Sequence, residues 1–582
     1  MSGPRGAEDL WSRAGAAMAV VFFALTLLLA LPAAPLTDDD DFYIPAGQDY
    51  AAWLGRVARL DLSAFRRSAI DDAFDANHEH PPVAKYALGL SGALLSGALG
   101  PVSGPRAGTV FFAVLAAAAM MWMARMQLGP RRGTLLGALS IGCLLLLPRF
   151  FFHARVATLD VPVAGMYTLT AALALRAERR SWAAWVLGPV FGLATATKLN
   201  APFFVVPYLA YALLVRGGTA RAARAASPGA EPSRRGFQLP SLPLGLLSMA
   251  VLGPLTFFAS WPWMWFDVIE RVQKYVSFHL GHYGIYFLYF GRLYDKDPYA
   301  PWHMPLVMAA ITIPLAISVL AMVGLAAGLP RMGARIYAGH AAWAAQGDEQ
   351  ARLREGELAL FVGLNAAATI CTVALSGGAK YGGAKLFMPF FPFWCLLAGY
   401  GGLRLGEAAW SRGPRARGLA GVALALVIAS GLGQHLRFAE TPLSQYNALA
   451  GGLRGATALG FERQYYDLAF RDLVQVLNDK APPNTRIHFL PNNWEYVRTF
   501  KWYRREGSLR SDLQVVQAEG VSDWVVLTHE RRFRRYGEDL RRARSWTVIE
   551  ERRVDGVPLW TILSRRAPAG AAAPPGLRPE AS

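Results

Sequence analysis

Four consecutive carboxylates, Asp38 to Asp41, are the part of the sequence best suited to chemistry. They come directly after the first long apolar segment and before Phe42 and Tyr43. Because neighbouring like charges repel one another, the run predicts a raised pKa for at least one carboxyl group, as a general base at neutral pH requires. A solvated acidic cap or a weak divalent-cation site is the alternative interpretation.

A second polar group lies just before the apolar segment 83–100, where His78, Glu79 and His80 precede two prolines and Lys85. The prolines predict a rigid entry into the segment. We expect Lys85 to lie at the membrane interface as a point charge for a phosphate, and Glu79 and His80 to position a substrate. Zinc is the alternative ligand, but no fourth metal-binding residue follows at a recognised spacing, so we assign no metal site.

Arg155 and Asp160 lie together at the boundary of another apolar run. The spacing predicts that Asp160 is the N-cap of the next helix, and an N-cap carboxylate there could also orient an acceptor. Snorkelling toward the interface is the alternative role for Arg155.

Two segments elsewhere are suited to anions. His279 and His282 occupy a basic, aromatic stretch of residues 262–303, which suits a sugar ring and a phosphate. Lys380 and Lys385 belong to a glycine-rich segment, where backbone N–H groups could approach an anion while the lysines neutralise it.

The elements that must position these residues are membrane helices. The chain is 53% hydrophobic and 17% charged, and apolar runs recur from residue 18 to residue 436, as in polytopic membrane proteins. The net charge of +18 is dispersed between these runs, which indicates topology signals and makes nucleic acid an improbable partner. The three cysteines lie in or beside apolar runs and indicate no disulfide framework.

The basic loops predict which side of the membrane each segment faces. If residues 83–100 lie at the interface without crossing, every later arginine-rich loop falls on the cytoplasmic side, and about eleven segments cross the membrane. The segment 15–34 is then an uncleaved first span, and the first outer loop covers residues 35–107. All the residue groups named above fall on the outer, extracytoplasmic face of the plasma (inner) membrane.

The chain changes character after residue 436. Short apolar runs, as at 486–490 and 523–528, alternate with helix-compatible stretches, which predicts a small exported α/β domain over residues 437–566. The final segment, 567–582, is rich in Pro, Ala and Gly and is predicted to be disordered. Residues 1–436 are then the membrane domain.

The order of these motifs resembles one enzyme family. Acidic residues and aromatics after the first span are followed by Glu79-His80-Pro81-Pro82-x-x-Lys85, an outer Arg and Asp, a Gly192…Thr197-Lys198 motif, Trp261-Pro-Trp-Met-Trp265, and Tyr381-Gly-Gly before the proline-rich segment 387–392. The chain is similar to membrane glycosyltransferases of the GT-C class. Within that class it resembles the group of protein O-mannosyltransferases and lipid A aminoarabinose transferases.

The resemblance implies an inverting glycosyltransferase that moves one sugar from a polyprenyl-phosphate donor to a hydroxyl acceptor. It implies that a carboxylate of the acidic run is the base, and spacing to Phe42-Tyr43 favours Asp39, with Asp40 as its neighbour and Asp41 as the rival. Lys85, Arg155, His279, His282, Lys380 and Lys385 would hold the donor phosphate. Asp160 would orient the acceptor, and Tyr43 would help to position the substrate.

The partners expected are this lipid-linked donor, membrane lipid and an acceptor whose class the sequence does not identify. No cofactor is required by this chemistry, and a divalent metal is the alternative. A transporter or flippase of lipid-linked sugars is the alternative function. Transporters place polar residues near the bilayer midplane and often contain inverted repeats, whereas here the polar residues lie at span ends and no repeat is visible.

Overall fold

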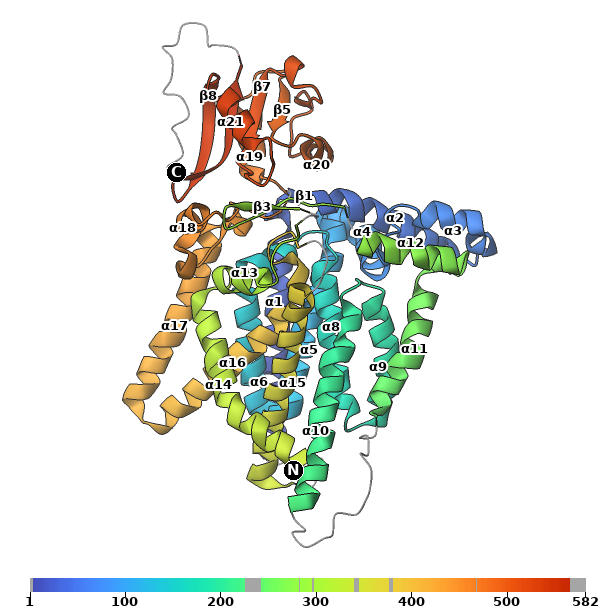
Figure 1. Ribbon diagram of the computed structural model, residues 1–582, viewed down its shortest axis with the longest axis vertical. Coiled ribbons are helices and arrows are strands. Elements are labelled where there is room, and N and C mark those ends of the chain that lie inside the picture. The colour runs from blue at the N-terminus through green and yellow to red at the C-terminus, as the bar shows by residue number, and fades with distance from the viewer. Residues whose placement is uncertain are drawn as a thin grey trace.

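The computed structural model describes residues 4–225, 242–281, 283–295, 298–339, 345–375, 380–466 and 468–565. Upright helices form a bundle with a small sheet domain beyond one end (Figure 1). The upright helices are α1 (Pro4–Leu29), α5 (Ser103–Leu128), α6 (Pro130–Leu145), α8 (Asp160–Ala177), α9 (Ser181–Thr195), α10 (Val205–Ala225), α11 (Leu244–Ser260), α14 (Leu315–Ala338), α15 (Gly347–Leu375), α16 (Phe390–Ser411) and α17 (Pro414–Arg437).

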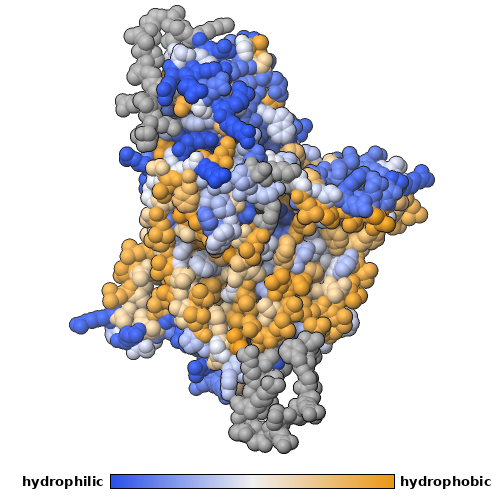
Figure 2. Space-filling model, viewed as in Figure 1, coloured by the Kyte–Doolittle hydropathy of each residue, from blue (hydrophilic) through white to orange (hydrophobic). Residues whose placement is uncertain are grey.

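The bundle has the surface of a multi-pass membrane protein. Among the described residues, five helices are long and apolar enough to cross a membrane, namely α1 from Asp9 onward, α5, α14, α15 and α17. Figure 2 shows hydrophobic residues around the bundle between two hydrophilic ends. The apolar stretch 304–338 is divided into α13 (Met304–Thr312) and α14 at Pro314, because proline lacks an N–H to continue a helix.

Two tight hairpins of the bundle use the same dipeptide. Gly129, with φ +76°, ends α5 and Pro130 begins α6; Gly413, with φ +101°, precedes Pro414 at the start of α17. Glycine adopts a positive φ without strain, and proline is tolerated at the first helical position because its missing N–H has no partner there. The chain therefore reverses direction sharply between α5 and α6 and between α16 and α17.

The ambiguous segment 83–100 forms α4 (Val83–Leu99), which lies beside α2 (Asp38–Ala58). The two backbones approach closely, since a Cβ atom on Gly89 would lie 1.8 Å from the Gly47 carbonyl oxygen. The following helix, α5, begins on the side where α1 ended, because Arg106 donates hydrogen bonds to the carbonyl oxygens of Ala34 and Pro35. The arrangement agrees with a segment that enters and leaves on one face.

Four helices form a platform that extends sideways from this end of the bundle (Figure 1). They are α2, α3 (Arg67–Phe74), α4 and α12 (Val268–Leu280). Buried aromatic side chains hold the platform together, including Tyr50, Trp53, Phe74 and Trp261. The acidic run and the aromatic residues that follow it thus belong to one helix of this platform, α2.

The C-terminal part contains the predicted sheet. Its strand order is β6 (Gln514–Val515), β5 (Arg486–Leu490), β7 (Trp524–Thr528), β9 (Val557–Ser564) and β8 (Thr547–Val554). Strand β5 pairs in parallel with β6 and β7, whereas β9 pairs antiparallel with β7 and β8. Helices α19 (Arg471–Lys480), α20 (Trp494–Arg505) and α21 (Tyr536–Ala543) accompany it. The predicted α/β character is confirmed, and the tail 567–582 lies outside the described residues.

The sheet domain is joined to the segment that follows α1. Strand β1 (Leu36–Thr37) pairs antiparallel with β4 (Leu468–Ala469), and α20 lies against α2. The chain segments on both sides of the acidic run are thereby fixed by residues more than four hundred positions later in the sequence.

Candidate active site

The four carboxylates form the first turn of α2, where the helix dipole favours negative charge. Although they are adjacent in sequence, their side chains meet different partners. The partners, rather than the charge of the run, distinguish the four residues.

Asp40 is committed to the fold. Its side chain is fully buried and accepts five hydrogen bonds, two from Arg106, two from Thr37 and one from the Ala157 amide, at 2.6–3.0 Å. A carboxylate so fully bonded has little capacity to take a further proton. These contacts give Asp40 a structural role, because they join α2 and α5 to the loop before α8, and its catalytic role stays a prediction.

Asp41 joins the platform to the sheet domain. It accepts hydrogen bonds from Trp502 Nε1 and Arg498 Nε, both at 2.7 Å, and lies 2.7 Å from Lys501 Nζ. Burial opposes its charge, but the bonds from Lys501, Trp502 and Arg498 hold the pKa of Asp41 below its ordinary value. The carboxylate of Asp41, the rival candidate for the base, is thus already bonded to side chains of α20.

Asp38 is the carboxyl group whose pKa is raised. Burial raises the pKa of Asp38 to about 6, assisted by Asp39 and Asp41 and opposed by Arg498. Its Oδ1 atom lies 3.7 Å from Arg498 Nη1, and the side chain is 18% exposed. The raised pKa predicted from the run therefore belongs to its first residue.

Asp39 belongs to a group of charged residues that we call the acid–base cluster, namely Asp39, Asp160, Lys198, Lys385 and Tyr466. Lys385 Nζ lies 2.9 Å from Asp39 Oδ2 and 3.9 Å from Asp160 Oδ2, and it donates to the Tyr466 hydroxyl at 3.3 Å. Lys198 donates to the other Asp160 oxygen. Two carboxylates and two lysines thus alternate in one chain of contacts.

Five separate elements bring the cluster together at the platform end of the bundle. Asp39 lies on α2 and Asp160 begins α8, while Lys198 lies in the turn after α9. Lys385 begins the short helix η6 (Lys385–Phe387), and Tyr466 lies just before β4. The N-cap of α8 is Leu159, so Asp160 occupies the first helical position rather than the predicted N-cap.

Glycines place Lys385 in the cluster. Gly382 and Gly383 have φ values of +63° and +62°, a conformation that other residues adopt only with strain. A Cβ atom on Gly383 would also lie 3.0 Å from Arg149 Nη1 and 3.1 Å from the Tyr465 Cβ atom. The glycine-rich segment therefore provides the turn that directs Lys385 toward Asp39.

The electrostatics of the cluster favour charged lysine. Burial opposes the charge on Lys385, but Asp39 and Asp160 outweigh burial and hold the pKa of Lys385 above its ordinary value. The side chains of Lys385 and Asp39 are 10% and 13% exposed, and that of Asp160 is 1% exposed. His153 lies edge-on to Tyr466 at 5.4 Å between ring centroids, and burial lowers its pKa to about 3 despite the opposing charge of Asp160.

Lys85 is fully buried and anchors the segment before α4. Its Nζ donates to the carbonyl oxygens of Asn77 and His80 at 2.6 and 2.8 Å and to Asn77 Oδ1 at 3.2 Å. These bonds use all three N–H groups of a charged lysine. Burial lowers the pKa of Lys85 to about 7, with Glu79 opposing. In this structure Lys85 shapes a loop and does not face the cluster as a free phosphate ligand.

Three predicted positioning residues lie near the cluster. Tyr43 is buried, and its pKa is raised by burial and then by the charges of Asp39 and Asp160. Its ring meets the His80 ring edge-on at 6.0 Å. Burial and the nearby lysines lower the pKa of His80. Glu79 accepts a hydrogen bond from Asn77 at 2.8 Å.

The remaining predicted phosphate ligands are not among the five residues of the acid–base cluster. Arg155 donates to the Ala30 carbonyl oxygen at 2.7 Å and so fixes the end of α1. His279 lies 5.7 Å from the His80 ring, and Lys380 is 5% exposed. His282 lies outside the described residues. Among the described residues, no three His, Cys, Asp or Glu side chains are grouped as metal ligands would be.

Sequence reasoning gave no role to Lys198 or Tyr466. Lys198 closes the Gly192…Lys198 motif, so its position carried a signal, but the motif did not indicate that its side chain meets Asp160. Tyr466 lies 427 positions after Asp39, and the pairing of β1 with β4 and the packing of α20 on α2 help to bring the two together. Arg106 was not selected from the sequence either, because it lies near the start of the apolar helix α5.

Comparison with known proteins identifies one part of the chain. Residues 79–226 match the family model described as dolichyl-phosphate-mannose-protein mannosyltransferase. The match confirms the resemblance to this transferase group. It includes Asp160 and Lys198 of the acid–base cluster. No curated protein sequence matches the chain.

Three solved structures illustrate the similarity at low identity. ArnT from Cupriavidus metallidurans in the apo state is 15% identical, with 93% of this chain and 97% of that chain covered and a TM-score of 0.45. The same protein bound to undecaprenyl phosphate is 14% identical, with the same coverage and a TM-score of 0.41. The oligosaccharyltransferase AglB from Archaeoglobus fulgidus, in complex with an inhibitory peptide and a dolichol-phosphate, is 12% identical. The comparison covers 89% of this chain and 69% of that chain, with a TM-score of 0.43. We base the proposed function on the family match and the geometry of the site.

Proposed function

We propose that this protein is a membrane glycosyltransferase that moves a single sugar, with inversion, from a polyprenyl-phosphate-sugar to a hydroxyl acceptor. The observation that carries this proposal is the acid–base cluster. It joins Asp39 of the first loop to Asp160 and Lys198, which lie inside the segment matching the mannosyltransferase family.

Asp39 is the proposed base. Its carboxylate is the member of the acidic run that meets the cluster, whereas Asp40 and Asp41 are bonded to Arg106 and α20. In the reaction, Asp39 takes the proton of the acceptor hydroxyl as the oxygen attacks the anomeric carbon. The bond from that carbon to the phosphate oxygen breaks, and polyprenyl phosphate leaves with the electron pair.

The lysines are the proposed phosphate partners. Lys385 is paired with Asp39 at 2.9 Å, and a donor phosphate would take over part of this contact. The exchange would place the cation on the leaving group and free the carboxylate to act as a base. Lys198, held by Asp160, is the second cation within reach. Lys380 and His279 remain further candidates, and Asp160 would orient the acceptor.

The membrane position suits such a donor. The cluster lies at the end of the bundle beside the platform, where a long hydrocarbon tail could stay in lipid while its phosphate reaches the lysines (Figure 1). About eleven crossings, with the arginine-rich loops inside, would place this end and the sheet domain on the outer face of the plasma membrane. A transporter site is expected nearer the midplane.

The test is donor choice by the purified full chain. We expect release of polyprenyl phosphate from a polyprenyl-phosphate hexose or pentose in the presence of an envelope extract as the acceptor source. A nucleotide-linked form of the same sugar is the control and should give no transfer. Transfer from the nucleotide sugar alone would overturn the proposed donor class.

A further inference from the structure

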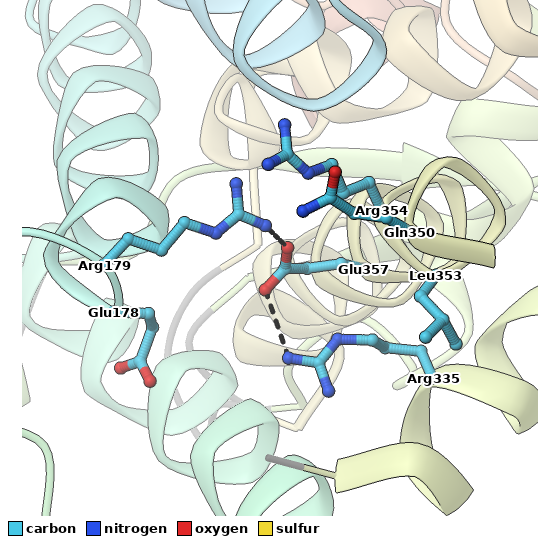
Figure 3. A pocket seen from close by; sticks show the side chains of 7 residues that line it. All are labelled: Glu178, Arg179, Arg335, Gln350, Leu353, Arg354 and Glu357. Atoms are coloured by element: carbon cyan, nitrogen blue, oxygen red, sulfur yellow. Dashed lines mark hydrogen bonds and ion pairs between the residues drawn. The ribbon is translucent and has the colours of Figure 1, made fainter. Parts of the chain in front are cut away.

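A charged cavity lies at the opposite end of the bundle from the acid–base cluster. It has a volume of about 380 Å³ and is lined by Glu178, Arg179, Arg335, Gln350, Leu353, Arg354 and Glu357 (Figure 3). This volume falls in the range of small-molecule sites, about 300–1,000 Å³. The proposed glycosyl transfer does not use it.

Helix α8 connects the two charged regions. Asp160 of the acid–base cluster begins α8, and Glu178 and Arg179 follow its last residue, 18 residues later. At 1.5 Å per residue the two ends are about 27 Å apart, close to the thickness of a membrane core. The cavity therefore lies on the face that carries the arginine-rich loops, which the charge distribution predicts to be cytoplasmic.

Ion pairs inside the cavity leave an excess of positive charge. Glu357 accepts hydrogen bonds from Arg179 and from Arg335, the latter at 3.4 Å. Glu178 accepts from Tyr208 at 2.9 Å and lies 3.3 Å from Arg216. Three lining arginines, Arg179, Arg335 and Arg354, and Arg216 beside the cavity thus share two carboxylates.

Arg354 differs from the other arginines of the cavity in its contacts. Among the described residues, it makes no hydrogen bond and no ion pair, although it is only half-exposed and lies within electrostatic reach of Arg179 and Glu357. Figure 3 shows Arg179, Arg335 and Arg354 around Glu357, each from a different element. Glu357 balances one of these three positive charges, and a bound anion would reduce the repulsion among the arginines further.

We propose that this cavity binds the phosphate group of an anionic ligand. The guanidinium group offers paired N–H donors that match phosphate oxygens, and Gln350 provides a further donor. Leu353 supplies an apolar wall beside these groups. A phospholipid headgroup and a soluble phosphate compound share this chemistry, and the test distinguishes these two sources.

The experiment compares two single-charge variants of the full chain in detergent. Arg354→Gln removes one cavity arginine and breaks no ion pair that the described part of the chain contains. Arg352→Gln removes an exposed arginine two residues earlier, which lies on another face of the same helix. Binding is measured by titration with inorganic phosphate and, separately, by native mass spectrometry with phosphatidylglycerol against zwitterionic phosphatidylcholine.

We expect saturable binding by the unaltered chain, about tenfold weaker binding by Arg354→Gln, and binding within about twofold of the unaltered chain for Arg352→Gln. Preferential retention of phosphatidylglycerol without phosphate binding identifies a lipid headgroup, whereas phosphate binding identifies a soluble ligand. Equal weakening in both variants, or no saturable binding of either probe, overturns the proposal. Because binding is measured without turnover, the result is independent of the proposed transferase activity.

Discussion

Two ion pairs lie side by side at the first turn of α2, and they differ in how completely their carboxylates are bonded. Asp40 is fully buried, pairs with Arg106 at 2.6 Å and accepts five hydrogen bonds. Asp39 is 13% exposed and meets Lys385 at 2.9 Å. The first pair has no room for a ligand, whereas the second could exchange its partner for one. Adjacent residues of the same type therefore have different roles because their partners differ.

The largest expected effect is a loss of folding stability when the fully bonded Asp40–Arg106 pair is broken. Asp40→Asn keeps the shape of the side chain but leaves the Arg106 charge buried without its counter-ion, a change that typically costs about 3–5 kcal/mol. Denaturation in mixed micelles should show this loss relative to the unaltered chain. The exposed Asp49, on the same helix, provides the control, and Asp49→Asn should change stability little. Equal stability of the two variants would contradict the structural role of Asp40.

The next largest effect is expected on the rate of turnover, when the exchangeable Asp39–Lys385 pair is broken. Lys385→Met should slow turnover about 100-fold, because the leaving phosphate loses its main cation, a loss of about 2.7 kcal/mol in the transition state. The affinity for polyprenyl phosphate, measured by equilibrium binding, should fall as well. Unchanged affinity together with unchanged turnover would show that Lys385 serves only to pair Asp39.

A smaller effect is expected in the pH dependence of stability. The pKa of Asp38 is raised from 3.8 to about 6 in the folded protein, so the folded state binds its proton more tightly than the unfolded chain does. This contribution is fully present below pH 4 and is lost as pH rises through about 6, on the order of 2 kcal/mol. Denaturation of Asp38→Asn between pH 4 and pH 7 should lack this pH-dependent loss of stability. If the variant shows the same dependence of stability on pH as the unaltered chain, the loss belongs to another group.

Much of the architecture could be predicted from local sequence signals. Long apolar runs predict the upright helices because lipid requires about twenty apolar residues per crossing. Alternating apolar runs predict β5, β7 and β9, and the basic loops indicate that α4 does not cross. Asp39, Asp160 and Lys385 were all selected as site residues, and the structure brings the three together.

The pairing inside the site could not be predicted because it depends on distant residues. Nothing in the acidic run distinguishes Asp40 from Asp39 until Arg106, 66 residues later, is placed against Asp40. Lys85 has the sequence context of an interfacial phosphate ligand, yet the turn at Asn77 to His80 supplies oxygens that take its N–H groups. Lys198 and Tyr466 reach the cluster only through helix packing and the pairing of β1 with β4.

The most direct test of the account is single turnover by Asp39→Asn with bound polyprenyl-phosphate-sugar donor. Because a positioned base contributes about 10²–10⁴-fold, formation of polyprenyl phosphate should slow by at least about 100-fold, while donor affinity and stability stay close to those of the unaltered chain. Asp49→Asn, the matched change on the same helix, should turn over at the unaltered rate. Turnover by Asp39→Asn at the unaltered rate would contradict the assignment of Asp39 as the base.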